Sequence, residues 1–120
     1  MSERAPLLLL EDETFIAIET QMTLEEGGEE EVLICTDNEE ARALVVENEP
    51  RAALIDFNLG GGETSEPIAR LLLDRGIPFA FLTGYTEATL ALPAAFVDVP
   101  RFSKPCHGDE VLAWLQGLPR

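Results

Sequence analysis

Short apolar runs recur along this chain, and each one leads into a polar residue. Runs of four or five apolar residues that end in turn-forming residues are typical of strands buried on both faces, as in a parallel sheet. Ligand-binding residues of an open parallel sheet gather at the carboxyl ends of its strands. We therefore expect the polar residues after these runs to converge on one pocket. The runs are 7–10, 52–55 and 79–82, with Phe102-Ser103 as a shorter and less apolar counterpart, and the polar residues that follow them are Glu11, Asp12, Asp56, Thr83 and Lys104.

The segments between the apolar runs carry helix signals. From 14 to 26 the sequence places Phe15, Ile18 and Met22 near one helical face, together with Leu24, and a glycine pair then ends the pattern. A strand at 32–35 follows this helix. The other helices are predicted at 38–48, 65–74 and 109–118.

One segment, 86–99, does not fit this regular pattern. Pro93 lies inside it and Pro100 directly follows it, and its apolar spacing fits no helix longer than about two turns. The chain otherwise alternates strand and helix from end to end, which predicts a single α/β domain over residues 1–120. We expect a doubly wound, five-stranded parallel sheet that is covered on both faces, with a short or disordered fourth helix.

The composition narrows the possible partners. The chain has 120 residues, of which 46% are apolar, enough for one domain with a core. A formal charge of −15 argues against nucleic acid and anionic membranes as direct partners, because both need clustered Lys or Arg. Cys35 and Cys106 show no metal-ligand spacing and imply no disulfide framework. No apolar stretch approaches membrane-spanning length, so we expect a cytoplasmic protein.

Three carboxylates at neighbouring strand ends need a counter-charge. Glu11, Asp12 and Asp56 cannot all be ionised at close range without one. A hard divalent cation supplies this charge, and oxygen-only ligands suit Mg²⁺. Asp56 can then act as a nucleophile, while Lys104 supplies a fixed positive charge and Thr83 a hydrogen-bond donor. These groups predict phosphoryl transfer onto Asp56, followed by hydrolysis of the acyl phosphate.

Each of these features also has an ordinary structural explanation. An acidic pair after a strand often begins a solvated helix, an Asp at a strand end is commonly a cap, and Thr is common in strands. The glycine run at 60–62 lacks the Gly-Lys-Ser/Thr of a nucleotide-binding loop. The occurrence of all the polar residues in order, each on a different strand end, favours the functional explanation.

The same residues in the same order resemble the receiver domain of two-component response regulators, over essentially the whole chain. In that family an acidic pair follows strand one, the phosphoacceptor Asp ends strand three, a Thr or Ser ends strand four, and Lys-Pro follows strand five. The resemblance implies a flavodoxin-like sheet with strand order 2-1-3-4-5.

The resemblance also implies a role for each residue. Glu11 and Asp12 would hold Mg²⁺, directly or through water, and Asp56 would be both a metal ligand and the phosphorylation site. The other implied roles are the backbone carbonyl of Asn58 as a metal ligand, Thr83 and Lys104 as ligands of the phosphoryl oxygens, Gly84 as the small residue that gives phosphate access, and a cis Lys104-Pro105 peptide that places the ammonium.

The region 78–85 resembles a subgroup of stand-alone receivers with the signature Phe-Ala-Thr-Gly-hydrophobic-Tyr. That subgroup is associated with an altered fourth helix and with histidine kinases of the HWE or a related type. Arg101 stands where the family usually carries its aromatic switch residue, so Tyr85 or Phe102 would have to substitute for it. Phe81, Thr83, Gly84 and Tyr85 fit the signature, whereas Leu82 and Thr86 do not.

The resulting hypothesis is a monomeric, single-domain response regulator that accepts a phosphoryl group from a histidine kinase and is not otherwise an enzyme. No output domain follows the last helix, so we expect it to act through contacts with a downstream protein or as a phosphate sink. Two alternatives stay open. A haloacid-dehalogenase-like phosphatase also combines Asp, Thr, Lys and Mg²⁺, but its Asp-x-Asp normally lies on the first strand. The second alternative is an adaptor protein that has a receiver fold but is not phosphorylated.

Overall fold

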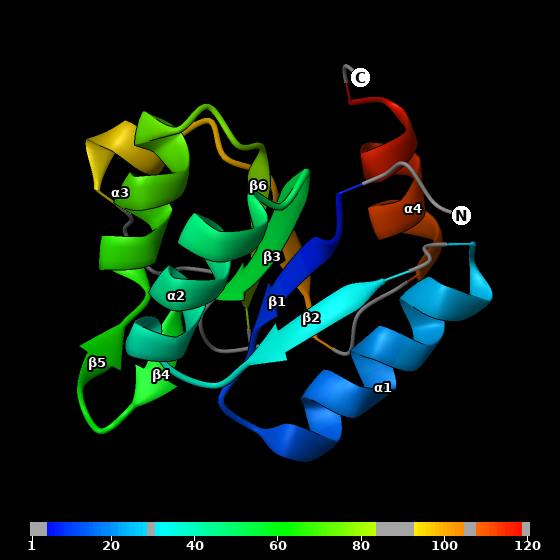
Figure 1. Ribbon diagram of the computed structural model, residues 1–120, viewed down its shortest axis with the longest axis horizontal. Coiled ribbons are helices and arrows are strands. Elements are labelled where there is room, and N and C mark those ends of the chain that lie inside the picture. Colours follow the sequence, from blue (N-terminus) through cyan, green and yellow to red (C-terminus); the bar gives the residue numbers. More distant parts are fainter. Residues whose placement is uncertain (1–4, 29–30, 84–92, 105–107, 119–120) are drawn as a thin grey trace.

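A computed structural model describes residues 5–28, 31–83, 93–104 and 108–118 of the protein. Its main sheet consists of β1 Leu7–Leu10, β2 Val32–Cys35, β3 Ala52–Asp56, β6 Phe79–Thr83 and β7 Arg101–Ser103. These five strands are parallel and lie in the order β2-β1-β3-β6-β7 (Figure 1). Counted along the chain this is the order 2-1-3-4-5, so the predicted fold class is confirmed.

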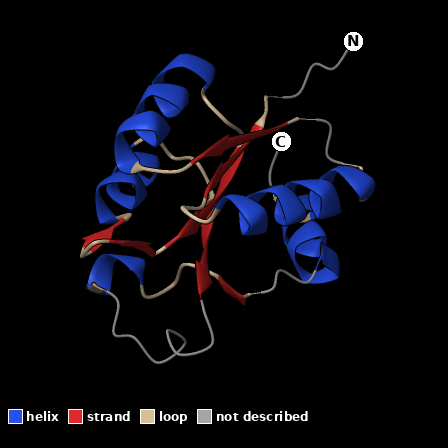
Figure 2. Ribbon diagram, turned by 90° about the horizontal axis from the view of Figure 1, so that it is seen from below, coloured by secondary structure: helices blue, strands red, loops and turns tan. Residues whose placement is uncertain are grey.

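Helices cover both faces of the sheet. They are α1 Thr14–Glu26, α2 Asn38–Asn48, α3 Glu66–Asp74 and α4 Gly108–Gln116. The pair α1 and α4 lies on one face and the pair α2 and α3 on the other, with the strands between them (Figure 2). Among the described residues, no helix has the length and apolar character needed to cross a membrane.

Each central strand contributes to two separate cores. In β1, Leu8 and Leu10 pack with residues of α2 and α3, whereas Leu7 and Leu9 pack with residues of α1 and α4. All four leucines are at most 3% exposed. Because successive side chains of a strand point to opposite faces, a strand covered on both sides is apolar throughout. Burial of each such side chain contributes about 1.5–3 kcal/mol, which explains why the apolar runs predicted the strands so well.

The boundaries of α2 show how local sequence sets a helix. The Asp37 carboxylate accepts a hydrogen bond from the Glu40 backbone N–H at 2.8 Å, and the Glu40 carboxylate accepts one from the Thr36 N–H at 2.8 Å. The first bond satisfies a donor that the first helical turn leaves unpaired, and the second ties the residue before the cap to that turn. At the other end, Glu49 adopts a left-handed conformation with φ of 45°, directly before Pro50.

Four phenylalanine rings fill the core beside the carboxyl end of β3. The Phe57 and Phe81 centroids lie 5.5 Å apart, and Phe81 and Phe96 lie 5.8 Å apart, in edge-to-face geometry. Phe79 contacts both Phe81 and Phe96. Phe96 belongs to the 3-10 turn η2 Ala94–Phe96, and the Arg70 guanidinium of α3 lies 5.4 Å from its ring centroid. The turn is thereby held against α3 and the sheet.

The irregular segment predicted at 86–99 lies only partly within the described residues. Its described portion, from residue 93, contains the single turn η2 and no longer helix. Residues 84–92 are outside the description, and the predicted roles of Gly84 and Tyr85 fall there. The predicted cis Lys104-Pro105 peptide also lies outside it, because residues 105–107 are not described.

The orientation of α1 differs from the prediction that placed Leu24 with Phe15, Ile18 and Met22. Leu24 is fully buried, whereas Phe15 is 90%, Ile18 44% and Met22 54% exposed. At 100° per residue, position 24 lies opposite the other three, so the grouping was wrong on geometric grounds. The buried face of the helix consists of Ala17, Thr20 and Leu24.

A small hairpin follows β3 and was not predicted. It consists of β4 Asn58–Gly60 and β5 Glu63–Thr64, which pair in antiparallel orientation. Gly60, Gly61 and Gly62 all have positive φ, at 81°, 60° and 83°. Glycine adopts this conformation without steric cost, so the glycine run makes the tight turn of the hairpin.

Candidate functional site

The predicted site residues lie together at the carboxyl edge of the sheet. Glu11 and Asp12 follow β1, Asp56 ends β3, Thr83 ends β6, and Lys104 follows β7. The parallel register brings these ends side by side: Asp56 pairs with Leu82 and Thr83 with Ser103. A backbone hydrogen bond of 2.9 Å from the Lys104 N–H to the Thr83 carbonyl extends the β6–β7 pairing as far as the lysine. The convergence expected from the strand pattern is therefore present.

Most of the polar side chains of the site are buried. Glu11 is 0%, Asp56 2% and Thr83 6% exposed, whereas Asp12 is half-buried. Burial of a charge without a partner is costly, so such groups are normally paired or bind a cation. The arrangement of partners around these carboxylates therefore defines what the site can do.

Lys104 makes ion pairs with two of the acids. Its Nζ lies 2.8 Å from Asp56 Oδ2, to which it donates a hydrogen bond, and 2.9 Å from Glu11 Oε1. The lysine side chain is only 15% exposed, so water screens these contacts weakly. One ammonium thus lies between two carboxylates, and a net negative charge is left over.

The pKa values of Asp56 and Lys104 are both raised in this site, for different reasons. Burial raises the pKa of Asp56 from 3.8 to about 8, the hydrogen bond from Lys104 opposes this, and the charge of Glu11 adds to it. Burial alone would lower the pKa of Lys104, but its hydrogen bonds to Asp56 and Glu11 outweigh that effect and raise it. Lys104 therefore stays charged, and in the part of the chain that the structure describes it is the one cation paired with these carboxylates.

The donor atoms of the site fit a second cation. Glu11, Asp12 and Asp56 each offer a carboxylate oxygen, and these oxygens lie within 4.8 Å of one another. Within the described residues, Asp56 Oδ1 is buried without a hydrogen-bond partner. An oxygen-only set of this kind suits Mg²⁺, so the residues present fit the predicted metal. Glu11 Oε2 already accepts a hydrogen bond of 3.1 Å from the Glu13 backbone N–H, which orients the Glu11 carboxylate.

The structure leaves other predicted roles as predictions. Asn58 begins β4, two residues after Asp56, and the role of its backbone carbonyl as a ligand is not tested. The Thr83 side chain is buried at the correct strand end, but its contact with a phosphoryl group is equally untested. Phe102, one candidate for the switch aromatic, has its ring centroid 6.0 Å from that of Trp114 in α4, and Arg101 is exposed.

Sequence reasoning missed one neighbour of the acidic cluster. A Cβ atom built at Gly60, in the β4–β5 hairpin, would lie 3.4 Å from Asp12 Oδ2. The triplet of glycines was the only signal of this hairpin. The backbone of β4 thus lies next to the Asp12 carboxylate.

Comparison with known proteins places this site in a family. No protein-family model matches the sequence, and no curated protein matches it. The solution structure of SdrG from Sphingomonas melonis Fr1 is 35% identical over 97% of each chain, with a TM-score of 0.80. The BeF3-activated conformation of SdrG from Pseudomonas melonis Fr1 is also 35% identical over 97% of each chain, with a TM-score of 0.77.

A longer protein shows the same similarity over part of its length. The crystal structure of the response regulator PhyR from Brucella abortus is 29% identical over 93% of this chain, with a TM-score of 0.73. The match covers 46% of PhyR, so this chain spans less than half of that protein. The sheet order, the clustered acids and the lysine that pairs with them agree with the resemblance to receiver domains. The 35% identity to SdrG over 97% of the chain shows that this chain belongs to the receiver domains of response regulators.

Proposed function

We propose that this receiver domain accepts a phosphoryl group on Asp56 from a phosphorylated histidine kinase, with Mg²⁺ held at the acidic cluster. One observation carries the proposal: Asp56 is buried at the end of β3, in contact with Lys104 and within 4.8 Å of oxygens from Glu11 and Asp12. A structural aspartate would not need this combination of one cation and two further acids.

The two oxygens of Asp56 have different surroundings. Oδ2 is held by Lys104 at 2.8 Å, whereas Oδ1 makes no hydrogen bond within the described residues. Oδ1 is therefore the oxygen without a hydrogen-bond partner in the described part of the chain, and we assign to it the contact with a phosphorus atom or a cation. In the proposed transfer, an ionised Asp56 oxygen forms a bond to phosphorus while the phosphorus–nitrogen bond of the phosphohistidine breaks, and the histidine leaves as a neutral imidazole that keeps the proton already on its other ring nitrogen.

The neighbouring residues neutralise and orient the groups involved. Glu11, Asp12 and Asp56 would hold Mg²⁺, which when bound neutralises the carboxylates and the phosphoryl oxygens. Lys104 is anchored at the end of β7 and keeps its charge next to Asp56, so it can contact a phosphoryl oxygen with little movement. Thr83 lies beside it at the end of β6, where its hydroxyl can donate a hydrogen bond.

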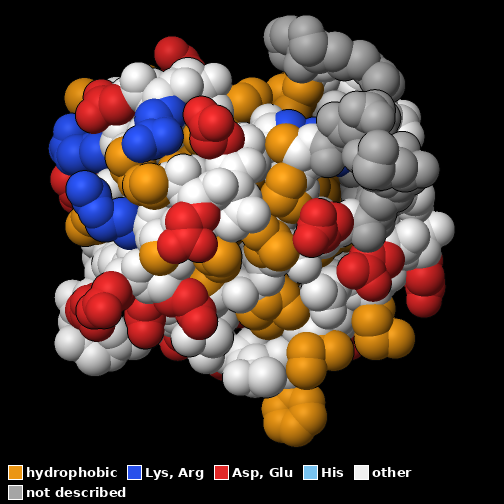
Figure 3. Space-filling model, in the orientation of Figure 1, with side chains coloured by type: hydrophobic (Ala, Val, Ile, Leu, Met, Phe, Trp, Pro, Cys, Tyr) orange, Lys and Arg blue, Asp and Glu red, His pale blue; other side chains and the backbone are white. Residues whose placement is uncertain are grey.

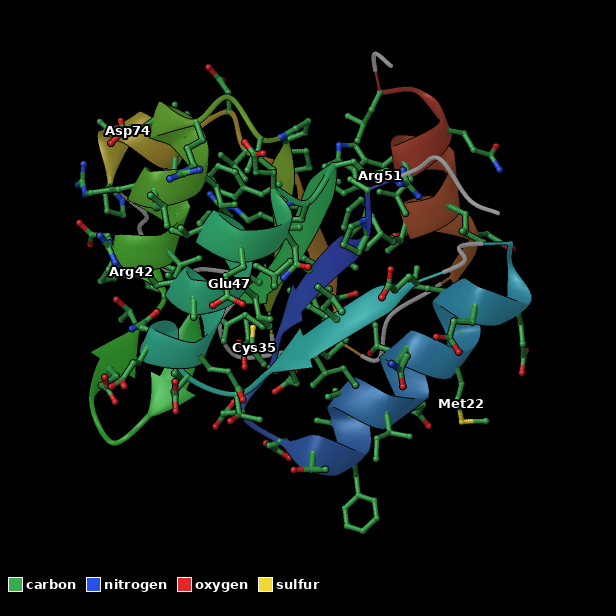
Figure 4. The ribbon with its side chains drawn as sticks, viewed as in Figure 1. Met22, Cys35, Arg42, Glu47, Arg51 and Asp74 are labelled. Atoms are coloured by element: carbon green, nitrogen blue, oxygen red, sulfur yellow. The ribbon has the colours of Figure 1, made fainter. Side chains whose placement is uncertain are left out.

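An exposed apolar surface on α1 supports a protein as the phosphoryl donor. Phe15, Ile18 and Met22 form this surface, which we call the α1 stripe, and Figure 3 shows apolar side chains along that edge of the molecule. Met22 points away from the sheet in Figure 4. The stripe begins three residues after Asp12, so it starts near the acidic cluster.

The charge of α1 indicates what kind of protein fits. The helix contains glutamates and no Lys or Arg, so a second copy of this chain would bring like charges together. A helical surface with an apolar groove bordered by basic residues would be complementary. We therefore propose that the kinase presents such a groove to the α1 stripe when it delivers the phosphoryl group.

The proposal is tested by incubation with acetyl phosphate and Mg²⁺, followed by intact mass measurement, for the wild type and Asp56→Asn. We expect the mass of one phosphoryl group to be added to the wild type only. A matching gain in both proteins, or in neither, would refute phosphorylation of Asp56. A circular dichroism spectrum of the variant serves as the control for folding.

A further inference from the structure

The β4–β5 hairpin stands beside the acidic cluster, and Gly60 is the glycine of its turn that faces Asp12. A Cβ atom at Gly60 would lie 3.4 Å from Asp12 Oδ2, which is van der Waals contact. The same construction at Gly61 or Gly62 meets no atom within 4 Å. All three residues have positive φ, so they share one backbone constraint and differ in what a side chain would touch.

The base of the hairpin is held in place by hydrogen bonds to the body of the domain. The Ser65 N–H donates to the Phe57 carbonyl at 2.8 Å, which closes the hairpin directly after β3. The Asn38 side-chain amide donates to the Thr64 carbonyl at 2.9 Å, which links β5 to the start of α2. Because both ends of the hairpin are tied, β4 cannot easily move away from Asp12.

We infer that the hairpin forms one wall of the cation site, and that the absence of a side chain at Gly60 keeps the Asp12 carboxylate open to hydrated Mg²⁺. Mg²⁺ retains several of its waters when it binds to proteins, so the space around each carboxylate oxygen matters as much as the oxygen itself. A methyl group in contact with Oδ2 would occupy the position of a bound water and would desolvate the half-buried carboxylate. Gly60 is thus a positioning residue for Asp12, and this inference rests on the proposed function.

Calorimetric titration with MgCl₂ of the wild type, Gly60→Ala and Gly61→Ala tests the inference. The two alanine variants share the cost of a positive φ, but only the first places a methyl group on Asp12. We expect Gly60→Ala to bind Mg²⁺ about tenfold more weakly than the wild type, as is common when groups around the ligands are altered. Gly61→Ala is expected to retain wild-type affinity.

A second pair, Gly60→Asn and Gly61→Asn, covers the case in which alanine disturbs the turn, because Asn tolerates left-handed conformations. Equal Mg²⁺ affinity within both pairs would overturn the inference while leaving the proposed function intact, provided that the wild type binds Mg²⁺. Failure of the wild type to bind Mg²⁺ would overturn both. A lower Mg²⁺ affinity in the Gly60 variants alone would support the inference that the hairpin forms one wall of the cation site.

Discussion

Replacement of Asp56 by Asn is expected to stabilise the metal-free protein while abolishing phosphorylation. Asp56 is 2% exposed and its pKa is raised to about 8, mainly by burial and in spite of the hydrogen bond from Lys104. The folded state therefore disfavours the ionised carboxylate, whereas the unfolded chain ionises it near its ordinary pKa of 3.8. An uncharged amide of the same shape removes this penalty.

The size of the effect follows from the linkage between proton binding and folding. For an acid whose pKa is higher in the folded state, the folded protein binds more protons, so its stability falls as pH rises between the two pKa values. For Asp56 this window runs from about 4 to about 8. At about 1.4 kcal/mol per pKa unit, the penalty at pH 7 has an upper limit of roughly 4 kcal/mol. The Asn amide must itself be desolvated, so we expect a net gain of about 2 kcal/mol.

Urea denaturation in EDTA, followed by circular dichroism, measures this gain. We expect Asp56→Asn to exceed the wild type in free energy of unfolding at pH 7, and the difference to shrink at pH 5, where the penalty on the wild type is smaller. Addition of Mg²⁺ is expected to reduce the difference in free energy of unfolding, because the ion stabilises the wild type more than the variant. A variant less stable than the wild type in EDTA, or a gap that does not change with pH, would refute the reasoning.

Three further predictions concern packing and docking. Gly27→Ala would press a methyl group into the Leu112 side chain between α1 and α4, so its free energy of unfolding should fall by about 1–3 kcal/mol, and a Leu112→Ala background should remove most of this loss. Phe96→Ala empties a fully buried position in contact with two phenylalanine rings, so thermal or urea unfolding should show a loss of about 3–5 kcal/mol. Phe15→Ser should leave stability within about 0.5 kcal/mol, because the ring is 90% exposed. The same variant should slow transfer from a phosphorylated kinase about tenfold and leave labelling by acetyl phosphate unchanged, and equal slowing of both reactions would contradict the docking role of the α1 stripe.

The sheet and the acidic cluster could be predicted from sequence because one physical cause produces both signals. Strands buried on both faces are apolar along their whole length, so the first polar residue after each one marks the edge of the sheet. Asp56 and Lys104 were predicted as neighbours although they lie far apart in the chain, and the 2.8 Å contact between them agrees with that prediction.

Two features could not be predicted, for different reasons. The periodicity of α1 shows that Phe15, Ile18 and Met22 share a face, but not that this face is exposed. The small side chains Ala17 and Thr20 pack under the helix instead. The β4–β5 hairpin has strands of three and two residues, too short to show the alternation that identifies a strand. Its pairing depends on a glycine turn whose backbone angles are set only in the folded chain.

The division of the interior into two separate cores has a consequence for how the domain opens. Loss of α1 and α4 would expose Leu7 and Leu9 but leave Leu8 and Leu10 packed beneath α2 and α3. Partial unfolding of one layer can therefore occur while β3 still pairs with its neighbours and Asp56 stays in place. Amide hydrogens of β1 and β3 should accordingly exchange only through global unfolding, whereas each helical pair can exchange through its own smaller opening. The strands at the centre of the sheet would keep the phosphorylation site assembled during such fluctuations.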